Sequence, residues 1–516
     1  MKPFTRPDLM EVGYSADLPL EKMVEFANQR ITRGITSRKY ILKLLAREYG
    51  APFPLLEMRE ESLSFSQAII AKTKEEKANL AHVQSKMHEL MRCPKVLAGS
   101  IMPDACPSGP RPAEIPVGGG IIVDNAIIPA AHSADICCSM YVSFYEARTD
   151  VHTEMNALQQ STRFGPGGHH WDHLIDHEVL HEEVWDNPFL SGLKDRAKIY
   201  MADQGDGNHF AYLGKVTFHR SHIQQLNNAG YEEIAQQLLN SDTETKEYRA
   251  LVTHHGSRGL GSHLYKRGLG AAIKHTKKVA QGIPEAAAWL DYDTPEGSAY
   301  WEALQYVSRW TLANHQSIHT KFLHSISATA VSEFGNEHNF VWKRGLQFFH
   351  GKGATPAWND EQGRPLLGLI PLNMAEPILI TLGKNNVDYL SFAPHGAGRN
   401  LSRTRLKREF HRASPSPKAV EHVLAHSTAG LDIRWYLGQP DISESPLGYK
   451  DAQHIRDQIK DFGLANILAE IQPLGTIMAG SRKRNSDYEE EPLTPKQKRQ
   501  IQHRAERRRI KQNLNW

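Results

Sequence analysis

Residues 118–131, GGGIIVDNAIIPAA, form short apolar runs bounded by glycine and proline. Such runs are typical of buried strands joined by tight turns. This texture begins near Val96. Before it, LEKMVEFANQRI (20–31) and SQAIIAKTKEEKANLAHVQSKMHELM (66–91) have apolar residues three and four positions apart, which predicts helices.

The remaining chain alternates irregularly between predicted strands and helices, without a repeat of fixed period. Further helices are predicted at 221–240, 300–330 and 451–471. This mixture indicates an α+β fold with a single large core of mixed sheets and helices. Three regions are predicted: a mostly helical N-terminal region (1–95), the core (96–480) and a basic tail, partly disordered or helical (481–516).

Composition narrows the class of protein. The 516 residues are 40% apolar but contain no uninterrupted apolar run of the length that spans a membrane, so no membrane partner is predicted. The N-terminal residues lack the apolar segment of a secretory signal, and we predict a cytoplasmic protein. Four cysteines are too few for a disulfide framework and are expected to be packed, reactive or metal-bound.

Charge is spread unevenly along the chain. The net charge is +3, but residues 481–516 hold eleven Lys and Arg against five Asp and Glu, a balance of +6. The first 480 residues therefore sum to −3. A polyanion must accordingly be held by local patches or by the tail.

Five short segments place histidine, cysteine or aspartate beside polar residues and glycine. They are ADICCSM (134–140), GDGNHF (205–210), THHGSRGLG (253–261), NEHNF (336–340) and HGAGR (395–399). Singly, each is more typical of a structural turn. Together they supply a carboxylate, a thiolate and imidazoles, which suit Mn²⁺, Zn²⁺, Fe²⁺ or Co²⁺. Asp135 and Cys138 are three apart, so one turn could aim both at one metal cluster.

His395 stands at the start of HGAGR and is followed by Arg399 and Arg403. Glycines let backbone N–H groups approach an anion, and arginine forks bind phosphate. From these residues alone His395 could be an acid, a base, a metal ligand or a nucleophile.

This combination of motifs resembles the RtcB family of RNA ligases, in order and rough spacing, from about residue 75 to 480. HGKGATPA (350–357) and IMPDACPSG (101–109) also resemble motifs of that family. The resemblance implies an enzyme that joins RNA 3′-phosphate or 2′,3′-cyclic phosphate ends to 5′-hydroxyl ends, using GTP and Mn²⁺. RNA and GTP are thus the predicted partners.

The resemblance also implies roles for individual residues. His395 would be the catalytic nucleophile that takes up GMP. Cys138 would bridge two Mn²⁺ ions whose ligands are Asp135, Cys138, His209, His254 and His338. The implied nucleotide-binding residues are Asn208, His209, Phe210, His338, Asn339, Pro371, Leu372, Asn373, Met374, His395, Gly396, Ala397, Gly398 and Arg399.

Several positions depart from the family pattern. Tyr212 stands where the family has a glutamate, Ala479 replaces a lysine that contacts guanine, and Cys106 lies where a histidine is usual. Cys137 replaces an asparagine, and we interpret it as a packed thiol. We interpret the chain as a divergent member acting in RNA repair, with relaxed discrimination between GTP and ATP.

Two other functions remain open from the sequence. One is a dinuclear metal-dependent RNA phosphatase or cyclic phosphodiesterase that has lost ligation; the retained HGAGR motif argues against it. The other is a non-catalytic RNA-binding protein, which would not need the metal-ligand set. Separately, His173, His177 and His181 are predicted to share one helical face, favoured as a solvated face over a metal site.

Overall fold

The structure is a computed structural model that describes residues 2–14, 18–50, 52, 55–239, 243–413 and 417–480. The predicted basic tail, 481–516, lies outside the described residues. No helix within these ranges combines the length and hydropathy needed to cross a membrane.

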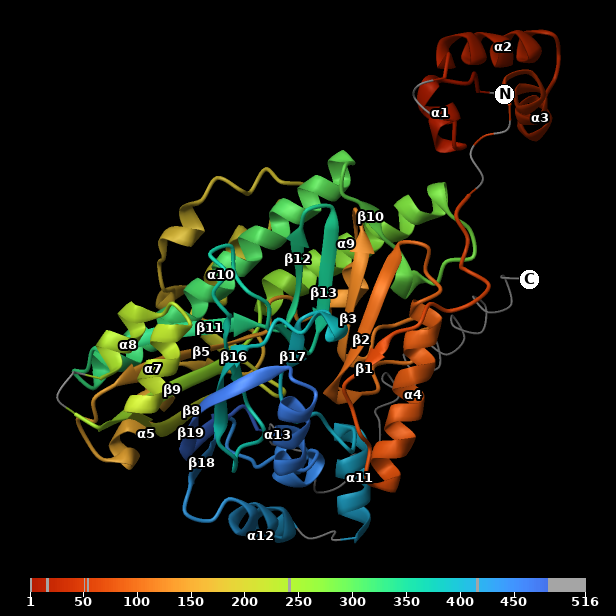
Figure 1. The fold of residues 1–516 in the computed structure, drawn as a ribbon. Coiled ribbons are helices and arrows are strands. Elements are labelled where there is room, and N and C mark those ends of the chain that lie inside the picture. The colour runs from red at the N-terminus through yellow and green to blue at the C-terminus, as the bar shows by residue number, and fades with distance from the viewer. Residues whose placement is uncertain are drawn as a thin grey trace, which may run out of the picture.

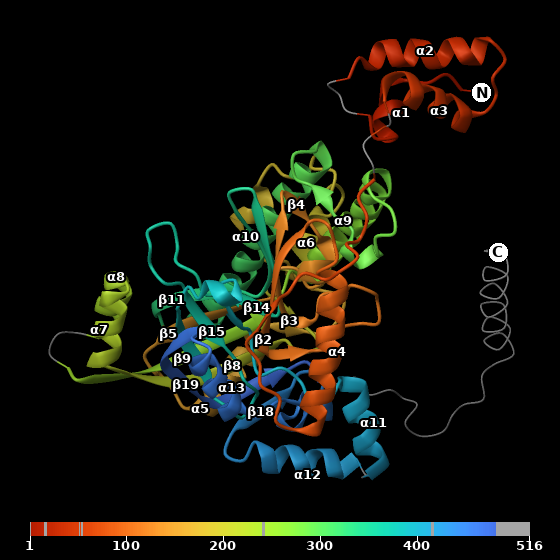
Figure 2. The same cartoon turned by 45° about the vertical axis from the view of Figure 1, so that its right-hand side comes forward.

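Three helices near the N-terminus pack on one another. They are α1 (Arg6–Glu11), α2 (Leu20–Thr32) and α3 (Arg38–Tyr49). Side chains including Phe4, Leu9, Met23, Ile41 and Leu45 form a hydrophobic cluster of their own. Figures 1 and 2 show these helices standing apart from the body. The helix predicted over 20–31 is confirmed.

The next predicted helix is shorter than expected. Ser66–Gln67 forms β1, which pairs with β2, and helix α4 covers only Lys74–Leu90. Thr73 and Glu76 form a capping box that fixes this start. One face of α4 buries Val83, Met87 and Leu90 in the largest core cluster.

The first half of the stretch 118–131 lies in a five-stranded sheet of order β1-β2-β3-β13-β12. Its members beyond β1 are β2 (Val96–Cys106), β3 (Val117–Asp124), β12 (Asn339–Arg344) and β13 (Gln347–Lys352). The stretch supplies β3, then β4 (Ala126–Ile127) and a 3₁₀ turn, Pro129–His132. The buried strands and turns predicted there are confirmed.

The second sheet carries most of the candidate site. Its order is β11-β5-β9-β8-β19-β16-β15, with β18 beside β19. The strands are β5 (Ser139–Tyr145), β8 (Phe210–His219), β9 (Thr245–His255), β11 (Ala330–Glu337), β15 (Leu367–Ile370), β16 (Ile378–Gly383), β18 (Asp432–Trp435) and β19 (Ala465–Met478). Along the main order the neighbours are antiparallel, whereas β18 runs parallel to β19.

Shorter strands and further helices complete the body. The strands are β6 (Arg163–Phe164), β7 (Asp203–Gly205), β10 (Leu290–Asp291), β14 (Ala354–Pro356) and β17 (Phe392–Pro394). The helices are α5 (Val151–Ser161), α6 (Lys194–Ile199), α7 (Arg220–Asn228), α8 (Glu232–Leu238), α9 (Arg258–Val279), α10 (Pro295–Ser325), α11 (Arg403–Ala413), α12 (Pro417–Ser427) and α13 (Ala452–Asp461). The mixture of helices and sheets is as predicted, while the domain boundaries at 95/96 and 480/481 stay predictions.

The predicted C-terminal helix over 451–471 is wrong beyond Asp461. Gly463 adopts φ +60, a left-handed conformation that ends α13, and Ala465 begins strand β19. That strand pairs with β16 on one side and β8 on the other. Similarly, the helix predicted over 221–240 is two helices interrupted near Gly230, whose φ is +81.

The shared helical face predicted for His173, His177 and His181 is also wrong. The segment forms two separate 3₁₀ turns, Trp171–His173 and Glu178–His181. The His170 and His177 side chains accept backbone N–H groups at the starts of these turns, which competes with a continuous helix.

Candidate active site

The register of the second sheet brings the predicted metal ligands together. His254 in β9 lies between Met140 of β5 and Phe210 of β8. Cys138 directly precedes β5, and His209 directly precedes β8. His338 follows β11, the other neighbour of β5. Segments separated by up to 200 residues thus meet at one end of four adjacent strands.

The five side chains form two groups that share Cys138. One group is Cys138, His254 and His338, and the other is Asp135, Cys138 and His209. The Cys138 Sγ atom lies 3.2 Å from His254 Nε2 and 3.7 Å from His209 Nε2. His209 Nε2 is 2.8 Å from Asp135 Oδ2, and the His254 and His338 Nε2 atoms are 3.1 Å apart.

Backbone contacts orient two of these imidazoles for metal binding. His254 Nδ1 lies 3.1 Å from Asn208 O, and His209 Nδ1 lies 2.8 Å from Gln204 O. We therefore assign a proton to each Nδ1, donated to these carbonyl oxygens. Arg258 Nη1 also lies 3.2 Å from His209 Nδ1, but the contact of His209 with the carbonyl is shorter. The Nε2 lone pairs then face the cluster, as in histidines that ligate metals. The nitrogen, sulfur and oxygen donors fit a transition-metal ion.

Burial determines the protonation of the cluster. It lowers the pKa of His254 to about 3 and that of His338 well below its usual range, so both rings are neutral at pH 7. Burial raises the pKa of the Cys138 thiol well above its usual range. Binding of a metal by this thiol would therefore release a proton. Burial also opposes ionisation of Asp135, but His209 and Arg258 hold the pKa of its carboxyl below the usual value.

The adjacent Cys137 has different surroundings. It adopts φ +57, donates its backbone N–H to Asn339 O at 2.8 Å, and belongs to the largest hydrophobic cluster. Neither of the two groups of candidate ligands among the described residues includes it.

His395 is held by a buried carboxylate, that of Asp104, which is not among the residues predicted for the site. Its Nδ1 atom lies 2.5 Å from Oδ2 of Asp104, which is fully buried in β2. This contact occupies Nδ1 and leaves Nε2 for the pocket. A Cβ atom on Gly353 would come within 2.8 Å of the His395 ring, so the packing needs glycine there. The available sequence signal was the motif IMPDACPSG, which contains Asp104.

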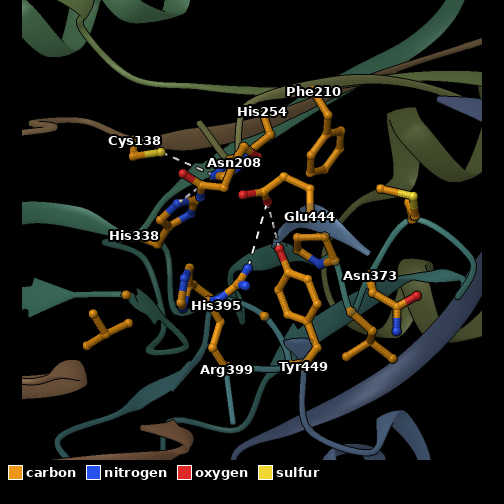
Figure 3. A pocket seen from close by; sticks show the side chains of 18 of the residues that line it. Cys138, Asn208, Phe210, His254, His338, Asn373, His395, Arg399, Glu444 and Tyr449 are labelled. Carbon is orange, nitrogen blue, oxygen red and sulfur yellow. Dashed lines mark hydrogen bonds and ion pairs between the residues drawn. The ribbon is translucent and has the colours of Figure 1, made fainter. Parts of the chain in front are cut away.

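A cavity of about 390 Å³ joins His395 to the candidate metal ligands (Figure 3). The His338 and His395 rings lie 4.9 Å apart, centroid to centroid. All the predicted nucleotide-binding residues line the cavity except His209, which is buried beside Asp135. The cavity is also lined by residues that were not predicted from the sequence, among them Lys352, Glu444, Tyr449, Thr476 and Met478.

The two arginines expected to bind phosphate have protein partners. Arg403 Nε donates to Glu444 at 2.5 Å, and Arg399 Nη2 donates to Ser443 O at 2.5 Å. Arg399 also stacks on Tyr449, its guanidinium carbon 4.8 Å from the ring centroid (Figure 3). Its Nη1 is 3.8 Å from Glu444, an ion pair too long for a hydrogen bond. In the described part of the chain Nη1 is a buried donor without an acceptor, which suits an anionic ligand.

Part of the cavity wall is formed by paired positions of β8 and β19. Phe210 faces Met478, and Tyr212 faces Thr476. The Tyr212 hydroxyl donates to Ile471 O at 2.9 Å and is thus already engaged. Ala479 packs in a separate hydrophobic cluster with Ala211 and Ile477, whose side chains alternate away from this wall.

Comparisons with known proteins agree with this arrangement of motifs. The protein-family model described as tRNA-splicing ligase RtcB matches residues 86–479. The chain is 24% identical over 315 residues to tRNA-splicing ligase RtcB of Nanoarchaeum equitans, covering 55% of this chain and 61% of that protein. It is 24% identical over 342 residues to that of Aeropyrum pernix, covering 60% and 66%.

The matched regions thus span less than two thirds of those two relatives. RNA-splicing ligase RtcB2 of Escherichia coli is matched more fully, at 24% identity over 412 residues, 77% of this chain and 92% of that protein. Because the family model covers most of the chain and includes every candidate ligand and His395, the chain belongs to the RtcB family.

Proposed function

We propose that the protein is an RNA ligase that joins 3′-phosphate or 2′,3′-cyclic phosphate ends to 5′-hydroxyl ends through a His395–GMP intermediate. The observation that carries the proposal is the pairing of His395 Nδ1 with buried Asp104, which leaves Nε2 in a cavity shared with the candidate metal ligands. An imidazole held in this way is oriented for nucleophilic attack.

In the first step, His395 Nε2 attacks the α-phosphorus of GTP. A nitrogen–phosphorus bond forms, the bond to the β-phosphate oxygen breaks, and pyrophosphate leaves. The ring becomes positively charged, and the Asp104 carboxylate lies where it stabilises that charge. The unpaired Nη1 donor of Arg399 is placed to bind a phosphate oxygen.

In the second step, an oxygen of the RNA 3′-phosphate takes the GMP from His395. The 5′-hydroxyl then attacks the activated phosphorus, and GMP leaves. A 2′,3′-cyclic end must first be opened by water to a 3′-phosphate. Two Mn²⁺ ions, held by Asp135, Cys138, His209, His254 and His338, would supply positive charge beside the reacting phosphates.

The Asp104–His395 pair favours this function over its rivals. A metal-dependent phosphatase or cyclic phosphodiesterase would use the metal ligands and bound water, without a histidine nucleophile. A non-catalytic RNA-binding protein would need neither group. The family match supports ligase chemistry over both.

Covalent labelling tests the proposal directly. Incubation with Mn²⁺ and GTP labelled at the α-phosphate should leave acid-labile label on the protein, because a phosphoramidate is acid-labile. Addition of RNA with a 3′-phosphate and a 5′-hydroxyl should discharge the label and yield joined RNA. GTP labelled at the γ-phosphate is the comparison. If only the γ-label reaches the protein, or if neither label does, the proposed intermediate is contradicted.

We expect a weaker preference for GTP over ATP than a site with a glutamate at position 212 and a lysine at position 479 would have. Neither Tyr212 nor Ala479 supplies such a contact, and one lost charged hydrogen bond weakens binding by about 1.5–3 kcal/mol, roughly ten- to over a hundredfold. Thr476 Oγ1 lines the cavity, buried and without a partner in the described chain. A hydroxyl can donate or accept and so suits either purine.

We therefore expect ATP to compete with GTP for labelling of His395 with a disadvantage of less than about a hundredfold, in line with the loss of one charged contact. The measurement is label incorporation at fixed labelled GTP and rising unlabelled ATP, with unlabelled GTP as reference. A preference for GTP above about a thousandfold shows that other groups read guanine. Asn373 is the first candidate, since its Oδ1 accepts from Ala375 N and its amide lies in the cavity.

A further inference from the structure

Helix α3 of the N-terminal helices carries a basic face. Lys39, Lys43 and Arg47 are four positions apart, which places them on one side of the helix. All three are exposed, and none is in an ion pair among the described residues. Tyr40, at the flank of this row, is 52% exposed. We call Lys39, Tyr40, Lys43 and Arg47 the α3 face.

The α3 face belongs to a unit outside the region that defines the family. The family match begins at residue 86, whereas α1–α3 end at Tyr49. These helices have their own hydrophobic cluster, and polar contacts such as Arg38–Asp8 at 2.7 Å lie within the unit. The catalytic cavity contains none of its residues.

Charge indicates what the α3 face binds. Residues 1–50 contain nine Lys and Arg and six Asp and Glu, a balance of +3. Since residues 481–516 carry +6 and the whole chain +3, residues 51–480 sum to −6. A body with that net charge repels a polyanion at long range. An enzyme acting on RNA therefore gains from a positive surface outside the body.

We propose that the α3 face binds the backbone of single-stranded RNA, with Tyr40 stacking on a base. The identity of the partner rests on the proposed ligase function. Three cations in a row match successive phosphates, and an exposed aromatic ring beside them matches an unpaired base. A duplex offers no open base face to Tyr40, so the face favours single strands.

The test compares two triple variants of the full chain that lose the same charge. One is Lys39→Gln, Lys43→Gln, Arg47→Gln. The control, on the same helical unit, is Lys2→Gln, Arg6→Gln, Lys22→Gln, whose positions lie among acidic residues such as Asp8, Glu21 and Glu25. Fluorescence anisotropy of a labelled single-stranded RNA of about 16 nucleotides, titrated at several salt concentrations, gives affinity and its salt dependence.

The α3 variant should lower the slope of log affinity against log salt by about 2, since each phosphate contact on a single strand contributes about 0.7. Near 0.1 M salt this corresponds to a loss of about ten- to a hundredfold. The control variant should change both values by less than half as much. Equal effects of the two variants, or an unchanged slope in the α3 variant, overturn the proposal and leave the face to an acidic protein partner.

A second variant tests the stacking. Tyr40→Leu keeps a helix-compatible apolar side chain and removes the ring. It should lower the affinity for single-stranded RNA about tenfold and leave the affinity for duplex RNA unchanged. Equal loss with both RNAs overturns the assignment to single strands.

GMP capture by His395, measured on the same samples, should be unaffected, because the α3 face is not part of the cavity. If the parent chain captures no GMP but binds RNA through the α3 face, only the ligase function is overturned. Normal capture of GMP, with RNA binding that does not depend on the α3 face, overturns only the assignment of RNA to that face.

Discussion

Replacement of His395 by alanine is expected to abolish covalent capture of GMP. The parent protein should carry acid-labile label, and His395→Ala should carry less than about a thousandth of it, because no other group replaces a lost nucleophile. The other neutral rings near the cavity, His254 and His338, direct their Nε2 atoms at each other within the candidate metal cluster. Quantifying protein-bound label after denaturing electrophoresis measures the effect.

His173→Ala is the matched control, since His173 lies in an exposed turn away from the cavity. It should retain the parent's label. The His395→Ala protein should also keep its metal content, because His395 is in neither group of candidate ligands. It should still seal RNA whose 3′-phosphate already carries GMP, as that step follows the action of His395. Full labelling of His395→Ala would remove His395 from the mechanism.

The candidate site residues could be picked out of the sequence more readily than the elements that bring them together. The metal-ligand candidates and His395 stand in short motifs with glycine, and such motifs can be read locally. Asp104 and Glu444 gain their positions only when β2 and the segment after β18 reach the same cavity. Nothing in the residues around Glu444 indicates that it lines the cavity, so only the fold reveals its position.

The errors in secondary structure have a common physical origin. The segment 464–471, LANILAEI, has apolar spacing compatible with both a helix and a strand. Pairing of residues 465–471 with β16, about 85 residues earlier in the chain, makes this segment a strand. The next residues of the same strand, 472–478, pair with β8, about 260 residues earlier. Likewise, Tyr212 stands where the family has a glutamate, and only the fold shows that its hydroxyl donates a hydrogen bond to the backbone oxygen of Ile471 on β19. Each outcome depends on a long-range neighbour that local spacing does not encode.

Metal binding should distinguish the adjacent cysteines. Cys138→Ser is expected to lose bound Mn²⁺ on dialysis, whereas Cys137→Ser should retain it. Cys138 Sγ faces two imidazoles and belongs to both candidate groups, and a hydroxyl is a far poorer bridging ligand than a thiolate. Loss of this one atom thus disrupts both groups. The measurement is the metal-to-protein ratio after dialysis, by elemental analysis.

Thermal unfolding separates a metal ligand from a packed side chain. In Cys137→Ser a hydroxyl replaces a thiol inside the largest hydrophobic cluster, which should lower the free energy of unfolding by about 1–3 kcal/mol with or without metal. The Mn²⁺-dependent rise in Tm should persist in that variant, because a ligand that binds only the folded state still stabilises it. In Cys138→Ser the rise itself should largely disappear. If the two variants lose metal equally, or if Cys137→Ser loses more, the bridging position belongs to Cys137; the φ of +57 at Cys137 and its contact with Asn339 would then have to change on metal binding.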